Sequence, residues 1–279
     1  MNPELSIIIP CYNQAPFIAE TLDSVLAQTL ANWECIVMDD GSSDGSGEII
    51  REYCRKDSRI KYYRQENGGV SRARNNAIRH ASGEFLLPLD GDDIIGPTYA
   101  EEALDYFRKH PETKLVYCLA HRFGEMNGPW VLPQYKFEWL VLENMIFCSA
   151  VFRKADFDKT EGYNENMVSG LEDWDFYLSL LSPQDIVYRI PKVLFFYRTR
   201  QNSRTSDADA TEKELTWQIM MNHPDLYKDY ILQFRRLHRE RAATLTFEEE
   251  KKIGRFFTKQ LRKSRERKLL RLYRLPKQK

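Results

Sequence analysis

The chain has 279 residues, 42% of them hydrophobic, with 41 basic and 41 acidic side chains, and this length suits one large α/β domain with an appendage. Its five cysteines form no CxxC pair and no Cys/His cluster, which argues against zinc and indicates a reducing compartment. No apolar run approaches the roughly 20 residues that cross a bilayer, and no basic segment precedes a long apolar stretch, so we expect neither a spanning helix nor a signal peptide.

The first 95 residues alternate apolar runs with helical periodicity. We expect strands over 5–10, 33–40, 60–64 and a run that ends at Asp90. A helix follows each of the first three strands, and Ser43 or Asp44 is expected to cap the second helix. Ser71 is the expected cap of the third helix, which extends to about Ala81. Strands and helices that alternate over short connections predict a parallel, doubly wound sheet.

The second half of the chain is more mixed. We expect helices over 97–109 and 172–181, strands over 115–123, 146–153 and 186–198, and a turn at Gly128-Pro129. From about Thr211 the pattern is helical and polar. The chain therefore divides into segments 1–95, 96–210 and 211–279. The fold class is α/β, with a mostly parallel central sheet flanked by helices and a helical, basic C-terminal extension.

The end of the chain is strongly basic. Residues 251–279 carry 13 Lys and Arg side chains against one acid, Glu266, whereas the rest of the chain is acidic. Apolar side chains interleave with these bases, a pattern compatible with an amphipathic helix at a membrane interface. We expect a cytoplasmic protein whose tail contacts an anionic surface on the inner face of the cell membrane, with a solvated end as the alternative. We do not expect nucleic acid as a partner, because no readout motif is present.

An acidic turn follows the fourth strand. Residues 84–93 form an apolar run that ends in Asp90, Asp92 and Asp93, with only Gly91 between the first two. Ligands of open α/β sheets bind at the carboxyl ends of such strands. Crowded carboxylates repel unless a cation lies among them, and hard oxygen ligands suit Mg²⁺ or Mn²⁺. The plainer interpretation is an ordinary acidic turn.

Two further strand ends are expected at the same rim. The first strand ends in Pro10-Cys11-Tyr12-Asn13 and the second in Asp39-Asp40-Gly41-Ser42. Tyr12 can stack on a base and Asp39 can accept from a base N–H, while a metal at the acidic turn can bridge phosphates. Glycines allow close backbone approach at positions 68, 69 and 91. Together these groups suggest a site for a nucleotide diphosphate.

Other α/β classes fit less well. No GxGxxG follows the first strand and no GxxxxGK[ST] is present, which counts against dinucleotide oxidoreductases and P-loop enzymes. An aspartyl phosphatase with Asp90 as its nucleophile stays open. So does a non-enzymatic, receiver-like nucleotide-binding module with an acidic pocket of Asp39, Asp40 and Asp90. Neither explains Tyr12-Asn13 or the acidic helix start at 172–175.

Gly170-Leu171-Glu172-Asp173-Trp174-Asp175 marks that helix start. Carboxylates in a first turn are stabilised by the helix dipole, so an ordinary helix N-terminus is one interpretation. In the functional interpretation one carboxylate is a general base and Trp174 is a platform for a sugar ring. Glu172 and Asp173 point about 100° apart on a helix, so they cannot flank one glycosidic bond as a hydrolase pair does. A single base fits better.

These motifs, in this order, resemble the signatures of family 2 inverting glycosyltransferases with the GT-A fold. Asp90-Gly91-Asp92 matches the family's Asp-x-Asp motif, and the resemblance spans about residues 4–205. The matching segments are 10–13, 39–46, 68–75, 89–93, 152–154, 162–163 and 172–175. Several motifs in the right order are far more specific than any one of them.

The resemblance implies a role for individual residues. Asp173 would be the catalytic base, with Glu172 and Trp174 on the acceptor side. Asp92 would be the main metal ligand, with Asp90 on the ribose or the metal. The residues implied on the donor side are Pro10, Tyr12, Asn13, Asp39, Gly69, Arg74, Asp90 and Gly91, of which the first four hold the base and ribose.

The implied activity is that of a metal-dependent, inverting hexosyl- or N-acetylhexosaminyltransferase. It would use Mn²⁺ or Mg²⁺ to move a sugar from a nucleotide-sugar donor, a UDP-sugar, to a hydroxyl of a glycan or lipid-linked acceptor in surface polysaccharide or lipopolysaccharide synthesis. Segment 1–95 would bind the donor and segment 96–210 the acceptor. One position departs from the pattern, because many relatives carry His where Arg200 stands. Arginine cannot ligate a metal, and its guanidinium could instead meet the diphosphate.

Overall fold

The computed structural model describes residues 2–200, 208–230 and 232. The chain divides into two compact units, residues 1–223 and 224–279. The expected boundary between 95 and 96 lies inside the first unit, where one sheet includes strands from both segments. The basic tail 251–279, with its expected membrane contact, lies outside the described residues. Across the described ranges, no helix combines the length and the apolar character needed to cross a bilayer.

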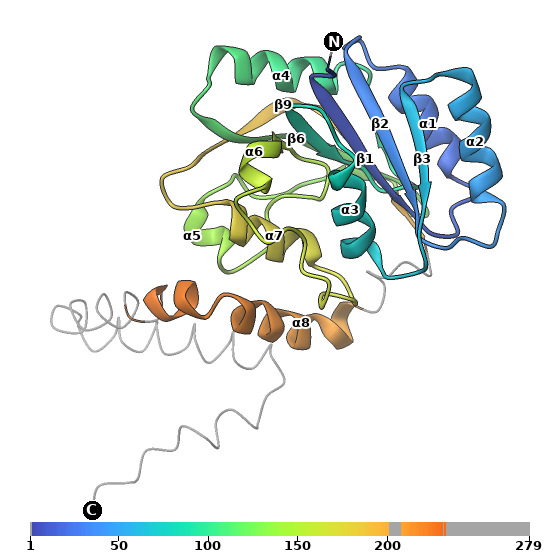
Figure 1. Cartoon of the computed structure of the whole chain (residues 1–279). Helices are drawn as coiled ribbons and strands as arrows, with labels where there is room; N and C mark the ends of the chain where they lie inside the picture. The colour runs from blue at the N-terminus through green and yellow to red at the C-terminus, as the bar shows by residue number, and fades with distance from the viewer. Residues whose placement is uncertain (1, 201–207, 231, 233–279) are drawn as a thin grey trace, which may run out of the picture. The chain divides into compact units, whose positions relative to one another are not determined.

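A sheet organises the first unit (Figure 1). The strands found among the described residues are β1 (Leu5–Cys11), β2 (Trp33–Asp39), β3 (Ile60–Arg64), β4 (Phe85–Pro88), β5 (Ile94–Ile95), β6 (Thr113–Gly124), β7 (Gly128–Trp130), β8 (Val151–Arg153) and β9 (Ile186–Thr199). Their order is β3-β2-β1-β4-β8-β6-β9-β5, with β7 paired to β6. Strands β3, β2, β1 and β4 run parallel, which confirms the parallel arrangement predicted for the first half.

Helices cover this sheet and bury its strands. The described helices are α1 (Ile18–Leu26), α2 (Ser46–Lys56), α3 (Val70–Arg79), α4 (Tyr99–Lys109), α5 (Phe137–Leu140), α6 (Lys154–Phe157), α7 (Glu172–Leu180) and α8 (Ala208–Asn222). Helix α3 packs on β1 and β2, and α4 packs on β6 and β9. Every residue of β1 is buried, which explains why its sequence is continuously apolar rather than alternating. Each Ile buried there contributes about 1.5–3 kcal/mol.

Beyond β4 the sheet is mixed. Strand β8 lies between β4 and β6 and is antiparallel to both. The strand predicted over 146–153 is therefore wrong in its first part, because only Val151–Arg153 pairs in the sheet. The carbonyls of Phe147 and Cys148 instead accept from the hydroxyl of Tyr177 at 2.9 and 3.0 Å. The hydroxyl of Tyr99 likewise donates to the carbonyl of Ser149 at 2.6 Å, so buried side chains take the backbone bonds that a strand would have made in the sheet.

The predicted helix caps are only partly right. Helix α3 begins directly after Gly69, so Ser71 lies inside its first turn and is not its cap. Gly69 has φ 87°, a conformation that glycine adopts without strain. Helix α2 begins after Gly45, and the carboxylate of Asp44 accepts from the N–H of Ser46 at 3.0 Å. Asp44 therefore accepts a bond from the first turn of α2, although the residue at the cap position itself is Gly45.

Candidate functional site

The carboxyl ends of β1, β2 and β4 meet at one edge of the sheet. Cys11 lies opposite Asp39 in the parallel register, and the backbone N–H of Asp40 donates to the carbonyl of Cys11 at 2.8 Å. Beyond β4, a Cβ placed on Gly91 would lie 3.3 Å from the carbonyl oxygen of Pro10. The acidic turn therefore lies against the end of β1, and the three strand ends line one rim.

The turn after β2 holds the segment after β1. The N–H of Asn13 donates to Oγ of Ser42 at 3.0 Å, and the N–H of Ser43 donates to Oδ1 of Asn13 at 2.9 Å. Asn13 has φ 51°, an uncommon conformation outside glycine that these two bonds hold in place. Tyr12, in contrast, is 51% exposed. A fixed backbone that presents an exposed aromatic ring suits stacking on a planar ligand.

Asp39 is buried below this rim. It is 1% exposed, and its carboxylate accepts from the hydroxyl of Tyr62 at 2.6 Å and from the N–H of Ser42 at 2.8 Å. These bonds orient the carboxylate and use part of its accepting capacity. The contact between Asp39 and a base N–H stays a prediction.

Asp40 anchors the glycine loop that precedes α3. Its two carboxylate oxygens accept from the N–H groups of Gly68 and Gly69, each at 2.8 Å. The carboxylate is thereby committed to the backbone of this loop. An acidic pocket shared by Asp40 and Asp90, as the receiver-like alternative requires, is therefore not formed by these side chains.

Arg74 connects the two halves of the site. The side chain lies on α3, is 0% exposed, and donates to Oδ1 of Asp90 at 2.5 Å and to Oε1 of Glu172 at 2.9 Å. A buried guanidinium between two carboxylates is strongly favoured to stay charged and fixed. It ties the acidic turn after β4 to the first turn of α7.

The acidic turn concentrates negative charge in a desolvated place. Burial, followed by repulsion from Asp90, raises the pKa of Asp92. Burial and repulsion from both of these neighbours raise the pKa of Asp93 well above its ordinary value. Both shifts come first from burial and then from like charge, and a nearby cation would offset both costs of ionising these carboxyls.

Two arginines at the end of β9, Arg198 within the strand and Arg200 just after it, supply part of that cationic charge. Arg198 donates from its N–H to Oδ1 of Asp93 and from Nε to the carbonyl of Asp92, both at 2.8 Å. Arg200 forms an ion pair with the carboxylate of Asp92. The residue predicted as the main metal ligand therefore already has a positive partner within the chain.

The oxygen atoms of this turn nevertheless fit a divalent cation. Among the described residues, Asp90, Asp93 and Cys148 bring ligand atoms within 4.8 Å of one another. Oδ2 of Asp93 is buried and has no hydrogen-bond partner in the described part of the chain. Carboxylate oxygens of this kind suit Mg²⁺ or Mn²⁺. Asp92 is not part of this group, and its Oδ2 is bound by Arg200.

Asp173 lies at the start of α7 beside Asn144. Its Oδ1 accepts from Nδ2 of Asn144 at 3.2 Å and from the N–H of Trp174 at 2.8 Å. Burial, followed by repulsion from Glu172, raises the pKa of Asp173 from 3.8 to about 7. Leu171, just before the helix, has φ 60°, a strained conformation that sets the direction in which α7 begins. A carboxyl with a pKa near neutrality is suited to accept a proton.

Two acceptor-side predictions meet contrary geometry. Trp174 is 4% exposed, and its indole N–H donates to the carbonyl of Leu140 at 2.6 Å. The prediction that this ring is a platform for a sugar is contradicted by its burial. Glu172 is also buried and is engaged by Arg74. The contact that Glu172 makes is with the guanidinium of Arg74, which it helps to orient.

We expect Trp174→Phe to leave the KM for acceptor unchanged and to lower the free energy of unfolding by about 1–3 kcal/mol. The reason is that phenylalanine keeps an aromatic ring but is smaller than tryptophan and leaves the carbonyl of Leu140 without its donor. Urea unfolding and acceptor titration with the same protein test this directly. A large rise in acceptor KM without loss of stability would restore the role as a sugar platform.

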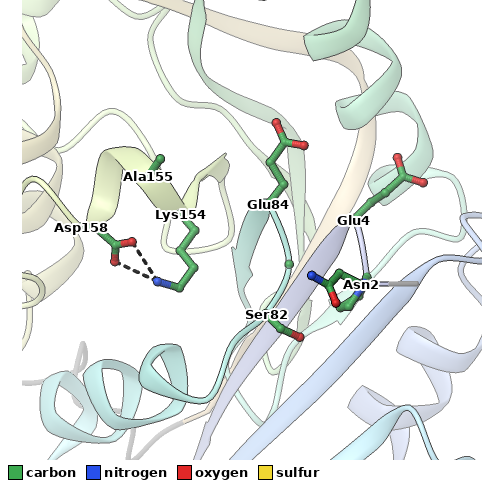
Figure 2. Close-up of a pocket in the computed structure, with 9 residues that line it drawn as sticks. Asn2, Glu4, Ser82, Glu84, Lys154, Ala155 and Asp158 are labelled. Carbon is green, nitrogen blue, oxygen red and sulfur yellow. Dashed lines mark hydrogen bonds and ion pairs between the residues drawn. The ribbon is translucent and has the colours of Figure 1, made fainter.

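A hollow of about 470 Å³ lies at the other end of the parallel strands (Figure 2). Its lining comes from segments 2–4, 82–84 and 154–158, which precede β1 and β4 or follow β8. Lys154 and Asp158 pair with each other there, at 2.8 and 3.0 Å. Because ligands of open α/β sheets bind at the carboxyl ends of the strands, this hollow is not the candidate site.

Sequence reasoning did not find several residues of the site. Asn144 lies in an irregular segment and has no motif around it, and Cys148 lay in a predicted strand. The ion pair between Arg200 and Asp92 joins residues 108 positions apart. No local pattern reveals such pairs, although two arginines at the end of an expected strand are an available signal.

Residues 6–165 match the sequence model of the family described as "Glycosyl transferase family 2". The chain is 30% identical over 226 residues to the uncharacterized glycosyltransferase EpsJ of Bacillus subtilis. The matched region covers 74% of this chain and 64% of that protein. It is 32% identical over 182 residues to chondroitin synthase of Escherichia coli, covering 64% of this chain and 26% of that protein. The chain thus spans less than two thirds of either relative.

Solved structures share the fold. S. aureus TarS in complex with UDP-GlcNAc superposes with a TM-score of 0.65 at 23% identity, covering 80% of this chain and 66% of that one. The mannosyltransferase PcManGT from Pyrobaculum calidifontis, in complex with GDP-Man and Mn²⁺, gives a TM-score of 0.58 at 21% identity, covering 74% of this chain and 60% of that one. The predicted GT-A fold is confirmed, and the chain belongs to glycosyl transferase family 2.

Proposed function

We propose that this protein transfers a hexosyl or N-acetylhexosaminyl group from a UDP-sugar to a hydroxyl of a glycan or lipid-linked acceptor, with inversion at the anomeric carbon. The observation that carries the proposal is the placement of Asp173, whose pKa is raised to about 7, across Arg74 from the acidic turn. The acidic turn, on one side of Arg74, suits a donor diphosphate. Asp173, on the other side, has a pKa that suits a general base at neutral pH.

Relatives support the substrate class. TarS is described in complex with UDP and with UDP-GlcNAc. The chain is also similar to EpsJ and to chondroitin synthase, whose name denotes the making of a polysaccharide. We therefore propose a role in polysaccharide synthesis.

The protein's own groups divide the reaction between them. Asp173 accepts the proton of the acceptor hydroxyl as its oxygen attacks the anomeric carbon. Oδ1 is held by two donors, and no hydrogen bond to Oδ2 is formed within the described residues, so Oδ2 is the atom available to that proton. Asp90 and Asp92 would hold Mn²⁺ or Mg²⁺, which supplies Lewis-acid stabilisation of the leaving diphosphate.

The structure disfavours the two alternatives. The receiver-like module needs Asp40 in a shared acidic pocket, but this side chain anchors the backbone of Gly68 and Gly69. The aspartyl phosphatase needs Asp90 as a free nucleophile, but Oδ1 of Asp90 is bound by the buried guanidinium of Arg74. Neither alternative uses Asp173.

A panel of sugar nucleotides tests the proposal. Each donor is incubated with the full chain, Mn²⁺ and candidate glycan acceptors, and released UDP is measured together with the anomeric configuration of the product. We expect release from one or a few UDP-sugars, with inversion. Release of inorganic phosphate from a phosphomonoester, with no UDP from any donor, would instead favour the phosphatase.

Tyr12→Ala should weaken UDP binding by about tenfold, because stacking of a base on an aromatic ring is worth about 1–3 kcal/mol. Tyr12→Phe keeps the ring and is the matched control, which we expect to bind like the parent. Isothermal titration with UDP and Mn²⁺ measures both. Equal affinity of the alanine variant and the parent would place the base elsewhere.

A further inference from the structure

Arg200 is a positively charged side chain that contacts the acidic turn directly. Its Nη2 pairs with Oδ2 of Asp92, and its guanidinium carbon lies 4.8 Å from the centre of the Phe17 ring. The side chain is 34% exposed, and its Nε has no hydrogen-bond partner among the described residues. Within the described part of the chain, one carboxylate and one ring face hold this guanidinium.

Arg198, two residues earlier, is held far more firmly. Its guanidinium donates to the carbonyl of Asp92 and to the carboxylate of Glu20, and its backbone N–H donates to the carboxylate of Asp93, each at 2.8 Å. Its guanidinium also lies between the rings of Phe17 and Phe123, at 4.9 and 4.3 Å. The contrast indicates that Arg198 fixes the end of β9, whereas Arg200 can leave with the loss of few contacts.

A carboxylate oxygen bound by a guanidinium is a poor ligand for a divalent cation. The two positive groups would share one oxygen, and like charges at such short range repel each other strongly in a partly buried place. Removing either cation would favour the other. Oδ2 of Asp92 can therefore serve Arg200 or a metal, but not both at once.

We propose that Arg200 is a positioning residue that competes with the metal for Asp92 and, once displaced, pairs with the diphosphate of the donor. The inference deepens the proposed function and rests on it for the identity of the anion. A guanidinium is suited to this transfer because its planar donors match carboxylate and phosphate oxygens equally well. Binding of a metal at the acidic turn would thereby release Arg200 to bind the diphosphate.

Two binding measurements on the full chain, neither of which needs turnover, test this. In the first, Mn²⁺ alone is titrated and followed by electron paramagnetic resonance. Arg200→Ala should bind Mn²⁺ about tenfold more tightly than the parent, because the competing cation is gone. In the second, UDP is titrated at saturating Mn²⁺, and the same variant should bind UDP about tenfold more weakly.

The opposite signs separate this role from a structural one, which would weaken both ligands together. Arg108→Ala removes an equally charged side chain whose partners, Glu4 and Asp105, are remote from the acidic turn, and it should change neither affinity. Arg200→Gln keeps the side-chain length and serves if the alanine variant does not fold. Equal Mn²⁺ affinity of parent and variant, or no binding by either, overturns the inference. UDP release from a donor decides the proposed function separately.

Discussion

Asp173→Asn is expected to lower kcat by about 10²–10⁴-fold while leaving UDP binding in the presence of Mn²⁺ unchanged. A general base contributes about this factor, and asparagine cannot accept the proton. Asparagine still accepts from Asn144 and Trp174 through its amide oxygen, so the local geometry is kept. Single-turnover transfer and UDP titration measure the two effects. Turnover like that of the parent would remove Asp173 from the role.

The pH profile gives a second, independent test of the same residue. Because the base must be ionised, kcat/KM should rise with pH and level off above the pKa of Asp173, which is about 7. An unperturbed aspartate would instead give a profile that is flat throughout the neutral range. The Asn144→Ala variant should alter this profile, since it removes one donor to the ionised carboxylate and thereby raises the pKa of Asp173.

Stability should move in the opposite direction to activity. The pKa of Asp173 is 3.8 for the ordinary group and about 7 in the folded protein, so the folded state holds the proton more tightly. The free energy of unfolding therefore falls as pH rises from about 3.8 to about 7, and the destabilisation from ionised Asp173 is fully present above about 7. Asp173→Asn removes this cost, so the inactive variant should be at least as stable as the parent at neutral pH. Asp158→Asn, at an exposed ion pair with Lys154, is the control for a neutralised carboxylate.

Much of the rim formed by the strand ends could be predicted from sequence because its determinants are local. The buried run of β1, the glycines at 68, 69 and 91 and the acidic turn each have a pattern within a few residues, and parallel strands place their carboxyl ends at one edge. The acceptor side contains more long-range contacts. The hydroxyl of Tyr177 holds the loop around Phe147, and nothing near residue 147 in the sequence signals this.

The error at Trp174 has a related cause. A tryptophan beside two acids has the composition of a sugar platform, but its exposure depends on what packs over it. Its indole N–H satisfies the carbonyl of Leu140, in the short helix α5 that periodicity did not reveal. Composition therefore suggested a chemistry for the 172–175 segment, which stays a prediction, and it could not show which of its side chains face inward.

Arg74 carries the second large expected effect. The guanidinium is 0% exposed between Asp90 and Glu172, so Arg74→Met would leave two carboxylates in a desolvated place without their cation. Breaking a buried pair by removing one partner costs about 3–5 kcal/mol. Urea unfolding followed by circular dichroism should show this loss. Arg108→Met, at an exposed pair with Glu4, should cost no more than about 1 kcal/mol.

The double variant Arg74→Met/Glu172→Gln shows where the destabilisation arises. If it comes from the unpaired carboxylates, neutralising Glu172 should recover part of it, with a coupling energy of about 0.5–3 kcal/mol between the two sites. If it comes from lost packing, the two losses should add. Activity provides the link to function, since Arg74 is what fixes the acidic turn relative to α7. A double variant that regains stability but not transfer would show that the bridge aligns the donor and acceptor sides as well as holding them together.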